Sequence, residues 1–453
     1  MSRVLVWLRA DLRLADNPLL RFDSPPETLL CVFVLDRDWL VAAAPGIPRI
    51  GSARLRFLWE SLIALRGELL SRGSDLLVRL GDPAAEVAAL AERHAIDEVR
   101  VRREAGWEEA RAVKRLAERL GAGVALRQPD GGTLLDEASL PTPLEQLPPS
   151  FSAFRRRAER DATVPAATPA PVTLPPWPEG ASRGLPPLEQ VCPEAAAWAP
   201  DERGEFHFAG GEAAGRERLE YFLQCGGPGH YKRTRDALMG PDFSTRLSPW
   251  LAHGCLSARQ VRDAVRAWEA EHGAGDSSYW VIFELLWRDY FHWAARQEGA
   301  ALFGQRPLPA GDAAFDAWRE GRTGMPLVDA AMGELAATGW LSNRARQNVA
   351  SYLVHALGGD WRLGAAWFEH CLIDYDAASN WGNWRYVAGV GRDRRGRHFD
   401  TLWQAERHDP EGAYLARWQP ALAELSSEAR HRPWRHAPER FPSPLDPRPA
   451  IDP

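Results

Sequence analysis

The sequence predicts a chain in two parts, an α/β part followed by an all-α part, and three observations support this fold class. Short apolar runs alternate with amphipathic stretches over residues 1–130. Strand-like runs then disappear, and helical periodicity dominates residues 209–425. Between the two lies a segment, residues 131–208, that is rich in proline, alanine and glycine. At 453 residues the chain is also too long for one ordinary core, so more than one domain is expected.

The first part contains five apolar runs with the length and composition of buried strands. These runs are Val4–Leu8, Leu29–Leu35, Leu76–Leu80, Val99–Arg102 and Val124–Leu126. The amphipathic stretches between them are Ser52–Ser71, Pro83–His94 and Trp107–Leu120. Strands that are apolar on both faces and alternate with helices form parallel sheets, so a Rossmann-like parallel sheet covered by helices is expected. The sequence holds no GxGxxG or GKS/T motif, which disfavours an ordinary dinucleotide or P-loop site.

Proline marks the two segments that flank the helical part. Residues 131–208 include PTPLEQLPPSF and VPAATPAPVTLPPWP. Because proline removes backbone donors, we expect this segment to be a long connector on the surface. Residues 426–453 are rich in proline and arginine and are expected to be poorly ordered. The predicted domain organisation is therefore 1–130, 131–208, 209–425 and 426–453.

Composition narrows the class of protein. Hydrophobic residues make up 45% of the chain and charged residues 26%, values typical of globular proteins. No apolar run reaches the roughly 18 residues that a membrane span needs, and the charged N-terminus MSRVLVWLRADLR is not typical of an export signal. The five cysteines show no CxxC pairing, which argues against a metal ribbon or a disulfide framework and fits the cytoplasm. The net charge of −6 neither supports nor excludes a local basic groove.

Two segments of the helical part combine polar groups that suit a ligand. In Asp242–Pro249, the hydroxyls of Ser244, Thr245 and Ser248 stand beside backbone N–H groups before a proline. This arrangement suits a pyrophosphate, and a simple Ser/Thr helix cap explains it as well. In Phe283–Asp289, a carboxylate and an indole share a helix face and could bind a base, although an ordinary ion-paired helix has the same pattern.

Two further segments follow along the chain. Thr338–Gln347 places Asn343, Arg344 and Gln347 on one helical turn. Ile373–Trp384 joins two acids to an Asn-rich loop inside an aromatic run. The polar and aromatic residues of this region are Asp374, Asp376, Asn380, Asn383, Trp361, Trp381, Trp384 and Tyr386. Buried carboxylates and amides are unfavourable unless they are paired, so a ligand site is favoured here over a packed core.

In this order, the four segments resemble the flavin domain of the photolyase/cryptochrome family. The most specific phrases are WRDYF, TGMPLVDAAM, TGWLSNRARQNVASYL and DWRLGAAWFEHCLIDYDAASNWGNW. The N-terminal WLRADLRLADNPLL resembles the opening strand and loop of the family, and the match extends from about residue 3 to 425. The phrases YKRTRDALMGPDFSTRLSPWLAHGCLS and GTLLDEASLPTPLEQLPPSFSAFR are similar to the cryptochrome DASH branch.

The resemblance implies a U-shaped FAD in the helical part. The residues that it assigns to FAD are Tyr231, Ser244, Thr245, Arg246, Leu247, Ser248, Glu284, Arg288, Asn343, Arg346, Asp374, Asp376 and Asn380. Of these, Asn380 would face the N5 atom of the isoalloxazine. Glu284, Trp287 and Asn343 would line a substrate cavity beside the adenine. Trp384 and Trp361 would relay electrons to the flavin.

The resemblance also implies an antenna role for the first part of the chain. Members of the family commonly hold a folate there, methenyltetrahydrofolate, through a carboxylate that follows the fourth strand. Glu108 stands at a suitable place. A first-turn acid at a helix N-terminus explains Glu108 equally well.

The activity implied by the resemblance is light-driven repair of cyclobutane pyrimidine dimers in DNA, by a monomeric lyase. Gln347 and Tyr386 stand where duplex-repairing members usually have Met and Trp, which predicts a more polar cavity and a preference for single-stranded DNA. Leu308 stands at the last position of the usual tryptophan relay, so either another ring such as Trp318 or Phe315 closes the relay or photoreduction is slow.

Contacts to DNA phosphates are assigned to Arg344 and Arg397. The rival interpretation is a blue-light sensor that regulates through partners and repairs nothing, because a fold does not fix a function.

Overall fold

The computed structural model describes residues 2–42, 46–304, 307–392 and 394–446. Its first part is a sheet of five parallel strands in the order β3-β2-β1-β4-β5. The strands are β1 (Arg3–Leu8), β2 (Thr28–Asp36), β3 (Leu76–Gly81), β4 (Glu98–Val101) and β5 (Ala125–Arg127). The helices between them are α1 (Ser52–Leu70), α2 (Pro83–Arg93) and α3 (Trp107–Arg119). The predicted parallel α/β fold is confirmed, and no end of these elements differs from its predicted position by more than one residue.

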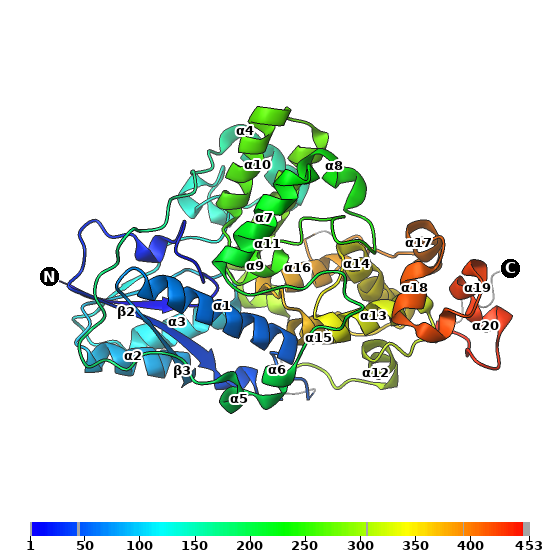
Figure 1. Ribbon diagram of the computed structural model, residues 1–453, viewed down its shortest axis with the longest axis horizontal. Helices are drawn as coiled ribbons and strands as arrows, with labels where there is room; N and C mark the ends of the chain where they lie inside the picture. The colour runs from blue at the N-terminus through cyan, green and yellow to red at the C-terminus, as the bar shows by residue number, and fades with distance from the viewer. Residues whose placement is uncertain (1, 43–45, 305–306, 393, 447–453) are drawn as a thin grey trace.

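Alternate residues of the strands enter two different cores, as the pleat of a strand requires. On β1, Val4, Val6 and Leu8 face the larger core, which continues into the helical part through α1. Leu5 and Trp7 face a smaller core closed by α2 and α3. Both faces of the sheet are therefore covered. Helix α1 lies on one side of the sheet, and α2 and α3 lie on the other (Figure 1).

The predicted connector contains more structure than its proline content indicates. It forms α4 (Phe151–Asp161), α5 (Leu188–Val191) and α6 (Pro193–Ala197). Phe151 and Phe154 of α4 are buried in the large core. Further on, Gly184 pairs with the outer side of β3, accepting from the N–H of Val78 at 2.8 Å. The connector therefore contains short helices, and it covers a face of α11 and an edge of the sheet.

The helical part follows without further strands among the described residues. Its helices are α7 (Glu212–Gln224), α8 (Gly227–Thr234), α9 (Ser248–Ala252), α10 (Ala258–His272), α11 (Asp276–Glu298), α12 (Ala313–Arg319), α13 (Pro326–Thr338), α14 (Asn343–Ser351), α15 (Trp361–Cys371), α16 (Ala377–Ala388), α17 (Thr401–His408) and α18 (Ala413–Trp418). Within the described ranges, no helix is both long and apolar enough to cross a membrane.

The start of the predicted tail is folded. It forms α19 (Ser427–His431) and α20 (Pro433–His436), and Trp434 is buried in the large core. The expectation of poor order is wrong for residues 427–436, because a tryptophan and two short helices provide apolar contacts that proline content alone does not reveal. Residues 447–453 lie outside the described residues.

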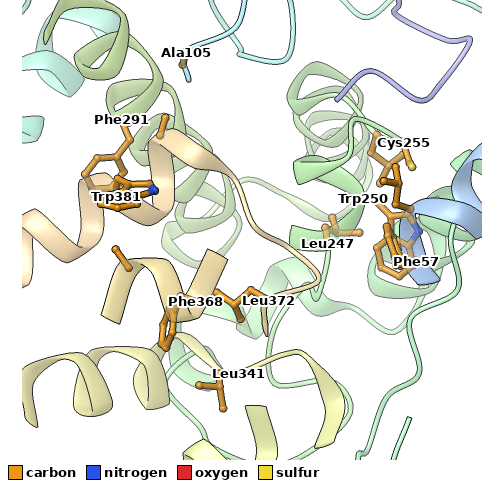
Figure 2. Close-up of a cluster of buried hydrophobic side chains, with 14 of the residues drawn as sticks. Phe57, Ala105, Leu247, Trp250, Cys255, Phe291, Leu341, Phe368, Leu372 and Trp381 are labelled. Carbon is orange, nitrogen blue, oxygen red and sulfur yellow. The ribbon is translucent and has the colours of Figure 1, made fainter. Parts of the chain in front are cut away.

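One continuous core joins the two parts of the molecule. Phe57 of α1 meets Trp250 of α9 edge-on, with ring centroids 6.1 Å apart. Figure 2 shows this pair, and on the same view Leu247, Leu341, Phe368 and Leu372, the last two from α15 and its C-cap. These four apolar side chains belong to the wall of the cavity described next.

Candidate functional site

A cavity of about 310 Å³ lies in the helical part and is lined by α8, α11, α14, α15, α16 and the loop before α9. The structure brings together nearly all the residues that the sequence assigned to a ligand. Those that line the cavity are Tyr231, Ser244, Thr245, Arg246, Leu247, Ser248, Glu284, Arg288, Asn343, Arg346, Gln347, Asp374, Asp376, Asn380 and Trp384. Trp287, Trp361 and Tyr386 are not part of this wall.

The loop 240–248 owes its shape to Arg246. This residue has a φ of +55°, a left-handed backbone that is uncommon for a side chain other than glycine. Its guanidinium donates to the carbonyls of Gly240 at 2.6 Å and Pro241 at 2.9 Å and lies 4.5 Å from the ring centroid of Trp340. The sequence assigned Arg246 to the ligand, but its guanidinium is occupied in holding the loop.

A second arginine, which the sequence did not single out, braces the same loop. Arg218 of α7 is buried and donates to the carbonyls of Thr245 at 3.0 Å and Ser244 at 3.1 Å. Because these carbonyls are held from behind, the hydroxyls are the groups of the loop that can still donate into the cavity. Two of their oxygens already accept a hydrogen bond, Thr245 Oγ1 from the N–H of Leu247 and Ser248 Oγ from the indole of Trp340, each at 3.3 Å. No local pattern could have revealed this contact, since 26 positions separate Arg218 from Ser244.

Glu334 of α13 lies close enough to Arg246 of the loop for their charges to interact. It accepts a hydrogen bond from the Tyr414 hydroxyl at 2.6 Å. Burial raises the pKa of Glu334 to about 7, and the nearby charge of Arg246 only partly offsets that effect. The carboxyl therefore titrates near neutral pH in the folded protein.

Replacing Glu334 by Gln should flatten the pH dependence of stability. The pKa of the folded state is about 7, above the ordinary 4.5, so its stabilising contribution is fully present at low pH and is lost as the pH rises through 7. For this pKa shift, the free energy of unfolding falls by at most on the order of 3 kcal/mol. Gln keeps an acceptor for Tyr414. Melting temperatures measured at about pH 5 and about pH 8 should differ less in Glu334→Gln than in the wild type; equal differences would contradict this role.

Two carboxylates follow α15 and face different partners. One oxygen of Asp374 pairs with the Arg346 guanidinium at 2.7 Å, and its other oxygen, Oδ1, is buried and finds no hydrogen-bond partner within the described part of the chain. Asp376 accepts from His292 at 2.8 Å and also caps α16 through the N–H of Ser379. Burial alone would raise the pKa of Asp376, but His292 and the nearby Arg288 outweigh burial and hold it well below its ordinary range.

Asn380 and Trp384 lie one helical turn apart on α16. The side-chain amide of Asn380 donates to the carbonyl of Ala365 at 3.0 Å, which leaves its oxygen as the group it can offer to a ligand. Trp384 is 2% exposed and meets Phe368 and Trp318 edge-on, with centroids 5.1 Å and 6.0 Å away. Both residues line the cavity.

The two other residues of the predicted catalytic set lie outside the cavity. Trp361 packs edge-on against Trp381, with centroids 5.9 Å apart. Trp287 is covered on one face by Phe151 of α4. The two rings stack with their centroids 3.7 Å apart and their planes inclined by 14°. Trp287 and Tyr386 make an edge contact, with their ring centroids 5.8 Å apart. One face of Trp287 is thus covered by a residue of the connector.

At the cavity mouth, Glu284 is ion-paired with Arg235 of α8. Asn343 is exposed at the start of α14. Gln347, one turn later, has a buried side-chain oxygen with no hydrogen-bond partner. The mouth therefore offers a carboxylate, an amide oxygen and an exposed amide, which together can bind a planar group carrying N–H donors.

A second cavity, of about 530 Å³, opens at the carboxyl ends of the strands and reaches the helical part. Two donors in its wall, Trp7 Nε1 and Arg9 Nε, are buried without a hydrogen-bond partner among the described residues, although Arg9 Nε lies 4.0 Å from the Glu104 carboxylate. Glu108 also lines it and is ion-paired with Arg49, which in turn holds Glu369 of α15 at 2.7 Å. The carboxyl ends of parallel strands are the usual ligand edge of such a sheet.

Two residues belong to both cavities. Tyr375 and Asp376 line the central cavity on one side and the cavity at the strand ends on the other. The short segment between α15 and α16 is therefore a common wall between two ligand-sized spaces.

Comparison with known proteins accounts for both parts of the chain. Residues 4–175 match the family model for DNA photolyase, and residues 280–444 match that for the FAD binding domain of DNA photolyase. A cryptochrome DASH from Natronomonas pharaonis is 42% identical, over 96% of this chain and 94% of its own length. One from Gloeobacter violaceus is 44% identical, over 96% and 89%.

Solved structures agree with the sequence relatives. A cryptochrome from Synechocystis sp. superposes with a TM-score of 0.91 at 37% identity and covers 99% of both chains. A class III photolyase from Agrobacterium tumefaciens gives a TM-score of 0.81 at 27% identity, over 98% of this chain and 94% of its own. The fold, the two family models and these relatives agree. The chain therefore belongs to the photolyase/cryptochrome family, and these relatives group it with the cryptochrome DASH members.

Proposed function

We propose that this protein is a blue-light-driven lyase that binds FAD in the central cavity and splits cyclobutane pyrimidine dimers, preferably in single-stranded DNA. The observation that carries the proposal is the central cavity itself. It combines a hydroxyl-lined loop, a buried unpaired carboxylate oxygen and a polar mouth. We further propose that it acts as a monomer in the cytoplasm.

The residues of the central cavity fit FAD. Ser244, Thr245 and Ser248 offer hydroxyls to phosphates, and Asp374 Oδ1 is an acceptor that lacks a donor until a ligand provides one. Burying such an oxygen without a partner is unfavourable by about 1–3 kcal/mol, so a ligand N–H placed there is stabilised. When bound, FAD supplies the group that absorbs light and donates an electron.

The side chains around the cavity bind and orient. Asn380 holds an amide oxygen in place through its bond to Ala365, and Asp376 remains ionised beside His292. Glu284 accepts from the imide N–H groups of the pyrimidine dimer, once Arg235 yields part of its ion pair. Asn343 completes the contact at the mouth. Arg344 and Arg397 are our assignment for the flanking phosphates.

We assign the cavity at the strand ends to an antenna molecule, with methenyltetrahydrofolate as the best candidate. The indole N–H of Trp7 and the Nε–H of Arg9, which make no hydrogen bond among the described residues, can bind carbonyl or carboxylate oxygens of such a molecule. Glu108 can accept from its amino group. The ion pair between Glu108 and Arg49 is the competing structural role of this acid, and it joins α3 to α15.

The proposal is tested by blue-light repair of matched oligonucleotides that carry one thymine dimer, with reduced protein in excess. Repair of the single strand well above that of the duplex supports it. Equal rates would overturn the single-strand preference. No repair of either substrate, in a protein that retains FAD, would overturn the lyase and favour a light sensor of the cryptochrome type.

Gln347→Met together with Tyr386→Trp should raise duplex repair about tenfold and change single-strand repair little. Gln347 presents an unpaired amide oxygen, and Tyr386 lies under the Arg397 guanidinium, 4.6 Å from its ring centroid. More apolar groups would bind a flipped dimer better. Only in the duplex must this binding offset an unpairing cost of a few kcal/mol. A difference of about 1.4 kcal/mol changes the occupancy of the cavity tenfold. Initial repair rates on the two substrates provide the measurement. A parallel rise on both would mean that polarity at these positions does not set strand preference.

A further inference from the structure

Helix α17 presents an exposed ring and an exposed charge on one face. Trp403 is 50% exposed, and the guanidinium carbon of Arg407 lies 5.2 Å from its ring centroid. Residues four apart are neighbours on a helix, so the two form one outward pair. The other face is buried through Thr401, Gln404 and Ala405 against α13 and α19. The packing of α17 is complete without Trp403, which leaves its indole available to a partner.

The segment that carries this pair contacts the wall of the central cavity. The backbone N–H of Arg397 donates to the carbonyl of Val387 at 3.0 Å, and Val387 lines that cavity. Two residues later, the N–H of Phe399 donates at 2.9 Å to the hydroxyl of Ser351, the last residue of α14. At the other end of α17, burial and the nearby charge of Arg344 lower the pKa of His408. The segment 397–408 thus passes along α14, from its last turn to its first.

A basic stretch precedes the exposed ring in the chain. Residues 391–397 have the sequence GRDRRGR, and Arg394 and Arg395 are exposed. The acids near Trp403 are engaged, because Asp400 caps α17 and Glu406 is ion-paired with Arg432. A ring beside a basic stretch is the arrangement by which proteins bind single strands, the bases stacking and the cations following the phosphates.

We propose that Trp403 is a stacking platform for an unpaired base next to the pyrimidine dimer, with Arg407 beside the adjacent phosphate. The inference rests on the proposed function and adds a residue that sets strand preference. In a single strand the flanking base is free to stack. In a duplex the same base must first leave its partner, so the platform favours single strands independently of the cavity.

The test measures binding in the dark, by fluorescence anisotropy, to a labelled single strand that carries one thymine dimer. Trp403→Ala should weaken binding about tenfold, since a stacked base contributes of the order of one such factor or more. Trp403→Phe should retain most of the affinity. Trp107→Ala is the matched control. Trp107 lies in the α/β part of the chain, is 39% exposed and has an arginine four residues later, Arg111, 5.8 Å from its ring centroid. This control should bind like the wild type.

Abasic sites placed one at a time on either side of the dimer locate the stacked base. At that position, removing the base should weaken wild-type binding as much as Trp403→Ala does, and the two changes together should add nothing further. Wild-type affinity in Trp403→Ala, or additivity at every position, would overturn the platform. Light-driven repair by the wild type on the same oligonucleotide is scored separately, and its absence would overturn the proposed function instead.

Discussion

Asp374→Asn should empty the central cavity of FAD. The substitution keeps the shape of the side chain but removes the charge opposite Arg346, 2.7 Å away, and replaces one acceptor oxygen by a donor. Where the amide nitrogen takes the place of the unpaired Oδ1, it would meet a ligand N–H with another N–H. Losing one charge-assisted hydrogen bond is worth about 1.5–3 kcal/mol, which at about 1.4 kcal/mol per factor of ten gives a loss of FAD affinity of roughly 10- to 100-fold.

The measurement is the FAD content of the purified protein, followed by titration of the FAD-free protein with FAD. Asp360→Asn is a matched control. Asp360 also pairs with an arginine, Arg362, at 2.5 Å, and it begins α15 away from the cavity wall. This control should keep its FAD. Full FAD content in Asp374→Asn would remove Asp374 from the binding set.

Trp384→Phe should suppress the light-driven reduction of bound FAD by tenfold or more. Trp384 is the tryptophan of α16 in the cavity wall, and phenylalanine is far harder to oxidise than an indole. An added barrier of only about 1.4 kcal/mol already gives a tenfold loss of rate. Protein reduced chemically should still repair DNA, because the ring is needed only to supply electrons. Absorbance changes under blue light measure the rate.

Trp293→Phe is the control for Trp384→Phe. Trp293 is 1% exposed and its indole N–H has no partner, so the change removes no hydrogen bond. Unchanged photoreduction in Trp384→Phe would place the first donor elsewhere, and loss of repair in chemically reduced protein would make Trp384 structural. The same assay on variants of Trp361 and Trp318 identifies the next donor, because the resemblance implies Trp361 whereas the indole in edge contact with Trp384 is that of Trp318.

Much of the fold could be predicted because its elements are locally encoded. The strand β2 is one apolar run, and α2 begins at Pro83 after its cap, Asp82. The helix α4 was missed because prolines surround it, although Phe151, Phe154 and Ala158 share one buried face. Proline restricts its own position and the one before it, and it says little about a run of eleven residues between prolines.

The candidate site was predicted as a set of residues but not as a geometry. The family motifs located Asp374 and Asn380, whose places in the cavity wall the structure gives. Periodicity could not reveal that Arg235 holds Glu284, or that Phe151 covers Trp287 from the connector. These partners are 49 and 136 positions apart in the chain, so only the folded structure brings them together.

The wall that Tyr375 and Asp376 form between the two cavities has a thermodynamic consequence. A molecule bound on one side restricts the motion of these side chains, and a second molecule then finds part of its own site already ordered. The two affinities are then linked by one coupling free energy, which by necessity acts equally in both directions. An antenna molecule in such an arrangement would be a cooperative ligand as well as a light collector, and the tightness with which the protein retains FAD would depend on it.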